Sequence, residues 1–382
     1  MASVTPLSRR PQFPPHSDLR QELTARVDDY FAREGIDPRG GGRMLAKTAW
    51  LGLWIVGSYL LLLLVANSWW TAVPLAISLG LGLAGAGFCV MHDGGHGAYS
   101  RKKWVNSLMA RTLDLMGGSS YFWNQKHNVV HHSFTNVDGI DDDIDSRPFV
   151  RMGPTQPRYW FHRWQHWYVL PLVGLFFIPK WGFIDDFVSW IRGKLGSHAI
   201  PRPGFSDGLV LLLGKASLVT WSLVIPLLLH PVLPVLVCYL VMAATWGITL
   251  ALVFQLAHAV EGTAFEALPP PGQRLQRSFF EHQLATTANF SPRSRVLTWY
   301  TGGLNYQVEH HLFPKICHLH YPAIAPIVRE VCRERGLPYH SNDTLWQALQ
   351  AHLRFMVRMG RPDDPALATT PAPASLPLRA AA

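Results

Sequence analysis

Residues 48–91 read TAWLGLWIVGSYLLLLLVANSWWTAVPLAISLGLGLAGAGFCVM, and this stretch contains no Asp, Glu, Lys or Arg. A second stretch of similar length, residues 216–260, is also free of these four residue types. A helix that crosses the hydrocarbon core of a bilayer needs about 20 apolar residues. Each stretch is long enough for two crossings joined by a turn. The sequence therefore predicts an all-α integral membrane protein with four transmembrane helices in two hairpins.

The turns within these stretches place the spans. We expect spans at about residues 50–66, 73–90, 209–229 and 233–257. The first pair turns at Asn67-Ser68-Trp69, and the second turns at His230-Pro231, where proline suits a turn. The remaining chain divides into a cytoplasmic N-terminal segment (1–47), a helical cytoplasmic cap within the membrane domain (48–345), and a C-terminal helix with a disordered tail (346–382).

The 382-residue chain is 48% hydrophobic and 15% charged, with a formal net charge of +9 at pH 7. A basic chain can bind nucleic acid, but the positive-inside bias of membrane proteins accounts for the excess, since the far-side turns carry no Lys or Arg. We therefore expect no nucleic-acid partner. Residues 1–40 contain no apolar run of a signal peptide. The sequence predicts a multi-pass protein, of the inner membrane if bacterial, with both termini cytoplasmic.

Two shorter apolar segments are not expected to span the membrane. Residues 104–123 contain Arg111 and Asp114, which indicates an amphipathic helix lying on the surface. Residues 167–179 are too short for a crossing and carry two prolines, which favours an interfacial or re-entrant segment.

Three histidine clusters stand out: HDGGH at 92–96, HNVVHH at 127–132 and QVEHH at 307–311. On a helix, positions i and i+4 lie on one face, so each cluster can present two groups to one centre. Neutral imidazole is the commonest metal ligand at physiological pH. Two crossings separate the second cluster from the third, so all three fall on the cytoplasmic side. The spacing and the topology together predict a histidine-rich site for two metal ions.

Position decides among the other histidines, because a single His on an apolar helix is more often a core residue than a ligand. His258 ends the fourth span at the depth where His92 leaves the second, and we expect it to be an eighth ligand. His162 and His166 also have i, i+4 spacing, but the aromatic residues around them indicate an interfacial helix with rings against lipid head groups.

Two further features are expected to lie apart from the site. His318 and His320 are two residues apart and would point in different directions on a helix. The acidic run from Asp138 to Asp145 is interpreted as a solvated loop, although it could pair with basic groups of the cap.

Taken together, the three clusters resemble the histidine boxes of the integral-membrane fatty acid desaturases. The similarity covers about residues 45–345 and includes LNY before the third cluster and LFP after it. The resemblance implies an oxygen-dependent enzyme with two iron ions. The ligands it implies are His92, His96, His127, His131, His132, His310 and His311, with His258 matching an extra histidine at the end of the fourth span.

An iron site of this kind suits desaturation chemically. Removing hydrogen from an unactivated methylene needs a strong oxidant, and iron bound by imidazoles can generate that oxidant from O2. The third cluster begins with Gln307, where many desaturases have histidine; this is similar to the front-end type, which works between an existing double bond and the carboxyl end. Five polar residues are candidates to orient the imidazoles by hydrogen bonds: Asp93, Asn128, Asn305, Gln307 and Glu309.

The resemblance also implies the partners: membrane lipid, and a fatty acyl substrate, carried by CoA or by a lipid, that receives a cis double bond. The first 47 residues lack the HPGG motif of a fused cytochrome b5 domain. We therefore expect electrons from a separate ferredoxin, or from cytochrome b5 with its reductase. Two alternatives stay open: a membrane di-iron hydroxylase, ketolase or alkane monooxygenase, and a non-catalytic lipid-binding protein.

Overall fold

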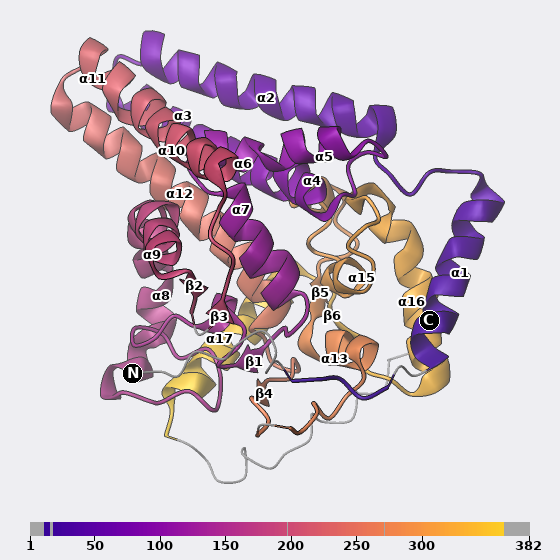
Figure 1. Ribbon diagram of the computed structural model, residues 1–382. Coiled ribbons are helices and arrows are strands. Elements are labelled where there is room, and N and C mark those ends of the chain that lie inside the picture. The colour runs from indigo at the N-terminus through magenta and orange to yellow at the C-terminus, as the bar shows by residue number, and fades with distance from the viewer. Residues whose placement is uncertain (1–10, 16–17, 197, 271, 363–382) are drawn as a thin grey trace.

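The computed structural model is mainly helical, with long helices at the top of the view and shorter helices below them (Figure 1). It describes residues 11–15, 18–196, 198–270 and 272–362, so most of the predicted disordered tail lies outside the described residues. Four helices in the described part are long and apolar enough to cross a membrane: Gly41–Leu64, Trp69–His96, Phe205–Leu229 and Val232–His258. The four predicted apolar helices are thus confirmed. The first begins at Gly41, well before the expected residue 50, and so includes Arg43 and Lys47.

The first two long helices pack against each other. α2 (Gly41–Leu64) is followed after a short turn by α3 (Trp69–Ala86), which continues through a π-helical turn (Gly87–Met91) into α4 (His92–His96). α3 also contacts α12 (Val232–His258). A Cβ atom at Gly80 would stand 2.6 Å from the Met242 carbonyl oxygen, so only glycine permits this approach. α3 therefore lies between α2 and α12.

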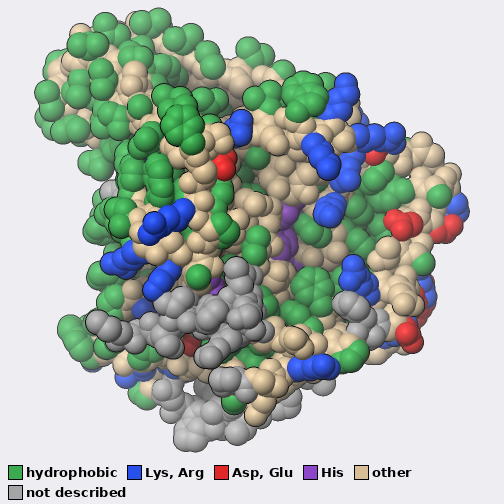
Figure 2. Space-filling model, viewed as in Figure 1, with side chains coloured by type: hydrophobic (Ala, Val, Ile, Leu, Met, Phe, Trp, Pro, Cys, Tyr) green, Lys and Arg blue, Asp and Glu red, His purple; other side chains and the backbone are tan. Residues whose placement is uncertain are grey.

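The second pair begins with α10 (Phe205–Val219), a π-helical turn (Thr220–Val224) and α11 (Ile225–Leu229), and returns as α12 after His230 and Pro231. The His230 Nε2 atom lies 2.7 Å from the Leu63 carbonyl oxygen, which joins the two turns. The long helices expose large apolar side chains, including Trp70 (91% exposed) and Leu228 (78%). Figure 2 shows mostly hydrophobic side chains at the upper left of the molecule, where α11 and the neighbouring ends of the long helices lie, as expected of a membrane protein.

The other elements are short, and they form the part of the molecule that holds the histidine clusters. The shorter helices are α1 (Asp18–Glu34), α5 (Lys103–Ala110), α6 (Thr112–Leu115), α7 (Ser120–Trp123), α8 (Gln165–Phe176), α9 (Asp185–Arg192), α13 (Phe279–Thr286), α14 (Arg295–Tyr300), α15 (Gln307–Leu312), α16 (Tyr321–Arg335) and α17 (Leu345–Gly360). Further π-helical segments are Asn124–His131 and Phe177–Ile184, and short 3-10 helices are Asp142–Ile144, Trp160–Trp164 and His318–His320.

Short strands add to the predicted all-α fold. β1 (Val137–Asp138) pairs in parallel with β4 (Glu266–Ala267), and β5 (Ala288–Phe290) pairs in parallel with β6 (His340–Asn342). β2 (Lys194–Leu195) and β3 (His198–Ala199) are antiparallel. The two parallel pairings join segments far apart in the sequence, and all three are too short to leave a periodic pattern.

The segment 104–123 is not the single surface helix that was predicted. It divides into α5, α6 and α7; α5 ends before Arg111, and Gly117, with a φ of 89°, separates α6 from α7. Asp114 is buried, and its carboxylate accepts a hydrogen bond from the Ser120 backbone N–H at 3.2 Å. The prediction failed because Asp114 was interpreted as a solvent-facing charge. The segment 167–179 forms α8 and the start of the next π-helical segment, and α8 packs against α12.

Candidate metal centre

The three histidine clusters come from three separate elements that meet beneath the long helices. The first is α4, which directly continues α3; the second is the π-helical segment Asn124–His131; the third is α15. α12 contributes His258, its last residue. Because α4 continues α3 and His258 ends α12, the packing of the long helices fixes where these imidazoles stand.

The structure brings all eight predicted ligands together. Their ring nitrogens fall into overlapping groups in which the atoms lie within 4.8 Å of one another. The groups are His92, His96, His127 and His310; His131, His258 and His311; and His132, His310 and His311. Since the third group shares residues with the others, the eight rings form one continuous cluster with two main centres.

The donor atoms of this cluster fit a metal. The Nε2 atoms of His96, His131 and His311 are buried and have no hydrogen-bond partner among the described residues. Other Nε2 atoms face each other, at 3.2 Å from His127 to His132 and 3.0 Å from His132 to His310. Buried polar atoms without partners are costly. Two cations, one in each main group of ring nitrogens, would give these Nε2 atoms a partner.

The pKa shifts of four of the clustered histidines favour the neutral form that binds a metal ion. Burial lowers the pKa well below its ordinary value for His127, His132, His310 and His311. These rings are therefore neutral and offer the lone pair that a metal requires. For His131, burial also acts to lower the pKa, but the Asp141 carboxylate outweighs it and raises the pKa above its ordinary value.

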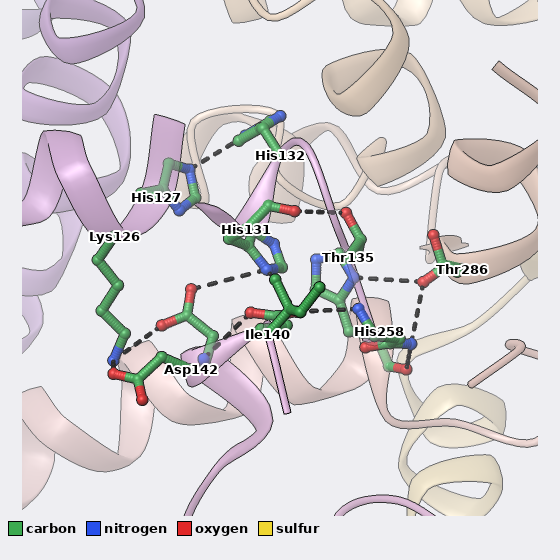
Figure 3. Close-up of polar contacts among 12 residues, drawn as sticks. Lys126, His127, His131, His132, Thr135, Ile140, Asp142, His258 and Thr286 are labelled. Atoms are coloured by element: carbon green, nitrogen blue, oxygen red, sulfur yellow. Dashed lines mark hydrogen bonds and ion pairs between the residues drawn. The ribbon is translucent and has the colours of Figure 1, made fainter. Parts of the chain in front are cut away.

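Hydrogen bonds on the outer nitrogens hold several of the rings in place. His131 Nδ1 donates to Asp141 Oδ2 at 3.0 Å, and both side chains are fully buried. The other contacts are His258 Nδ1 to the Thr286 carbonyl oxygen (3.3 Å), His311 Nδ1 to Gln283 Oε1 (2.8 Å) and His310 Nδ1 to Tyr321 Oη (3.1 Å). With Nδ1 occupied, Nε2 of each ring faces the cluster. Figure 3 shows His131, His258 and Thr286 in this arrangement.

The predicted orienting residues are only partly placed as expected. Gln307 Nε2 lies 2.9 Å from His258 Nε2, inside the cluster. Asp93 accepts a hydrogen bond from an imidazole, but from that of His318 (2.9 Å), which in turn accepts one from Lys47 at 2.8 Å. His318 is buried and is not grouped with the eight clustered rings.

For the remaining three candidates the prediction is wrong. Asn128 donates to the Gly95 carbonyl oxygen (2.9 Å), and Asn305 donates to Thr298 Oγ1 (3.0 Å). Glu309 accepts from Asn289 (2.8 Å) and Tyr339 (2.8 Å), which hold the carboxylate away from the imidazoles. These residues neighbour the ligands in sequence, but on a helix adjacent residues point in different directions. Burial raises the pKa of Glu309 to about 7.

The acidic run is not a solvated loop. Asp141 is 1% exposed, and besides His131 it accepts the backbone N–H groups of Asn136 (2.9 Å) and Asp143 (3.1 Å). Lys126 pairs with Asp143 at 3.0 Å and with Asp142 at 3.7 Å, as Figure 3 shows, so the alternative of pairing with basic groups holds. Sequence reasoning missed Asp141 because a run of acidic residues is usually exposed.

His162 and His166 are not among the grouped ring nitrogens, but the environment of His162 differs from the predicted one. His162 is 0% exposed, and its ring contacts the Pro148 carbonyl oxygen at 2.8 Å and the Tyr159 backbone N–H at 3.1 Å. It is a satisfied core histidine, not a ring at the lipid surface. His166 is half-buried.

Comparisons with known proteins agree with this arrangement. Residues 68–343 match the family model described as fatty acid desaturase. The chain is 38% identical over 343 residues to an sn-1 linoleoyl-lipid 6-desaturase of Arthrospira platensis, covering 89% of this chain and 92% of that protein. It is 37% identical to an acyl-lipid (8-3)-desaturase of Physcomitrium patens (90% and 72% covered) and 35% identical to an sn-1 linoleoyl-lipid 6-desaturase of Synechocystis (93% and 99% covered). The chain therefore belongs to the fatty acid desaturase family and is an oxidoreductase, as its histidine clusters predicted.

Proposed function

We propose that this protein is a front-end acyl-lipid desaturase that uses two iron ions and O2 to insert a cis double bond into a long fatty acyl chain. The observation that carries the proposal is the convergence of eight imidazole rings from four elements on two adjacent centres. His92, His96, His127 and His310 would hold one ion, and His131, His258 and His311 the other. His132 lies between the two groups, close to both His127 and His310.

When bound, iron in such a site supplies the oxidising power to remove hydrogen from an unactivated methylene. Overall, the acyl –CH2–CH2– unit, O2, two electrons and two protons give –CH=CH– and two waters. The chain contributes a largely buried and preorganised set of rings. Asp141, Gln283 and Tyr321 hold three of the rings at their outer nitrogens. Such outer contacts typically change metal affinity or activity by about 10–100-fold.

The substrate class follows from the relatives and from Gln307. The similar proteins are named for linoleoyl-lipid and acyl-lipid substrates. We infer a lipid-linked polyunsaturated acyl chain as substrate, with the new double bond between an existing one and the carboxyl end. Gln307 places an amide, not an imidazole, beside His258. The charge pattern of the turns supports a cytoplasmic site and cytoplasmic termini. Electrons would then come from a cytoplasmic carrier protein, a ferredoxin or cytochrome b5 with its reductase.

Expression in a host without polyunsaturated fatty acids tests the proposal. Cells fed linoleic acid should accumulate a triene whose new double bond lies toward the carboxyl end, detected by gas chromatography and mass spectrometry. The matched pair is His310→Ala, which removes a buried ring of the cluster, and His166→Ala, which removes a half-buried ring outside it. The first should abolish the product and the second should not. A hydroxylated product, or a product from His310→Ala, would contradict the proposal.

A further inference from the structure

We propose that electrons reach the metal centre through Trp123, and that a small acidic one-electron carrier protein docks on the basic surface beside it. The inference rests on the proposed iron site and adds where its electrons enter.

The cluster is closed on most sides. His92, His131, His132, His258, His310 and His311 are between 0% and 6% exposed. His96 and His127 are half-buried and are the two that remain in contact with solvent. Figure 2 shows histidine at the bottom of a hollow on the viewed face. An electron carrier that cannot enter the protein would come closest to the metal centre at this hollow.

Trp123 covers the same side of the cluster. Its ring stacks on His127 with centroids 4.5 Å apart and planes 24° apart. It also lies edge-on to His96 (5.6 Å) and His92 (5.8 Å), so one indole touches three rings of one centre. Trp123 itself is half-buried. It therefore reaches from the solvent side to the imidazoles without a gap.

The first histidine box is shaped to receive this ring. A Cβ atom at Gly95 would overlap the indole of Trp123, so only glycine leaves room for it. Trp123 ends α7 and His127 lies four residues later in the helical segment that follows, which places the two rings on one face. Electron tunnelling weakens exponentially with distance and is much slower through gaps than through packed atoms. A stacked aromatic ring is thus a suitable bridge.

The surface next to α4 is basic. α5 packs directly on α4, since a Cβ atom at Gly94 would stand 2.7 Å from the Ala110 backbone nitrogen. The turn before α5 carries Arg101, Lys102 and Lys103, all exposed. Figure 2 shows Lys and Arg side chains gathered beside the hollow.

Of these three cations, only Arg101 has a carboxylate partner among the described residues: it pairs with Asp37 at 2.5 Å. Lys102 and Lys103 have no carboxylate partner within the described part of the chain, and they stand at the N-cap and first position of α5, where positive charge opposes the helix dipole. Asn106 nevertheless fixes this turn by bonding to Ser100 at both its backbone N–H (2.8 Å) and its carbonyl oxygen (2.7 Å). An ordered turn with unfavourable charges indicates a partner of opposite charge.

The reduced carrier would give up one electron to a ferric ion held by the histidine cluster. No bond or proton would change at Trp123, whose ring stays neutral. Two such transfers supply the two electrons of each turnover. An iron–sulfur or haem protein with an acidic face has both the electron and the complementary charge.

The test follows anaerobic reduction of the ferric protein in nanodiscs of neutral lipid, by stopped-flow absorbance. Reduced acidic [2Fe–2S] ferredoxin is one reductant and dithionite the other. Trp123→Leu should slow reduction by ferredoxin at least tenfold per bound iron, with Trp123→Phe in between and the dithionite rate nearly unchanged. Equal ferredoxin rates per bound iron in wild type and both variants would overturn the role of Trp123. A wild-type protein without iron would instead refute the proposed function.

The docking surface is tested by charge reversal. Lys102→Glu with Lys103→Glu should slow reduction by ferredoxin at least tenfold at low salt, and added salt should remove the difference. The matched control is Arg33→Glu with Arg333→Glu, on exposed positions of α1 and α16, which should leave the rate unchanged. If the lysine variant matters only when the nanodiscs contain anionic lipid, the turn serves the membrane surface and the proposed docking is wrong.

Discussion

Replacement of Asp141 tests how the cluster is held. Asp141→Ala would leave three donors without this acceptor: the buried Nδ1 atom of His131, the buried backbone N–H of Asn136 and the partly buried backbone N–H of Asp143. Each buried unsatisfied donor costs about 1–3 kcal/mol, so the two buried donors alone would cost about 2–6 kcal/mol, a large part of the stability of a typical domain. Asp141→Asn is the sharper change, because it keeps the shape and turns one of the two acceptors into an NH2 group. We expect it to cost about 1–3 kcal/mol of stability.

The same substitution should weaken iron binding. Loss of a carboxylate behind a metal-binding histidine typically lowers affinity by about 10–100-fold, which corresponds to about 1.4–2.7 kcal/mol. The assay is bound iron per chain at increasing chelator concentration, with thermal unfolding of the detergent-solubilised protein measured in parallel. Asp145→Asn is the control in the same loop, since Asp145 pairs with Arg147 near the surface and should change stability by about 0.5 kcal/mol or less. Wild-type iron retention in Asp141→Asn would refute the reasoning.

Three further outcomes are expected. His92→Ala, His127→Ala and His310→Ala, one variant in each histidine cluster, should each abolish desaturation as measured by fatty-acid profiles. Membrane fractionation should show that all three variants still insert normally. His258→Ala should lose bound iron and activity, whereas His166→Ala, outside the cluster, should keep both; metal analysis that shows the reverse would mean that the wrong histidines were chosen. A membrane-impermeant thiol reagent applied from outside should label a cysteine at Ser68 and not one at Lys102; the opposite result would invert the topology.

Local properties of the sequence were sufficient to predict the membrane helices and to single out the histidines that the structure brings together. Hydropathy is a sum over neighbouring residues, so residues 48–91 and 216–260 show the long helices without any tertiary information. The i, i+4 spacing of HDGGH and HNVVHH depends only on helix geometry. His258 could be added because the length of a span fixes the depth of its end. The eight rings do come together in the structure.

Only the tertiary structure decided what surrounds those rings. Asp141 looked like part of a solvated acidic run, and it is buried because it serves an imidazole that lies ten residues away. Glu309, beside two ligands in sequence, is turned away toward Asn289 and Tyr339. Gly95 leaves the space that the indole of Trp123 occupies, a contact that the sequence does not show. Such contacts depend on segments that meet through packing, and no local periodicity records them. Spacing, span length and the family resemblance pointed to the histidines, whereas the contacts that hold their rings come from the tertiary structure.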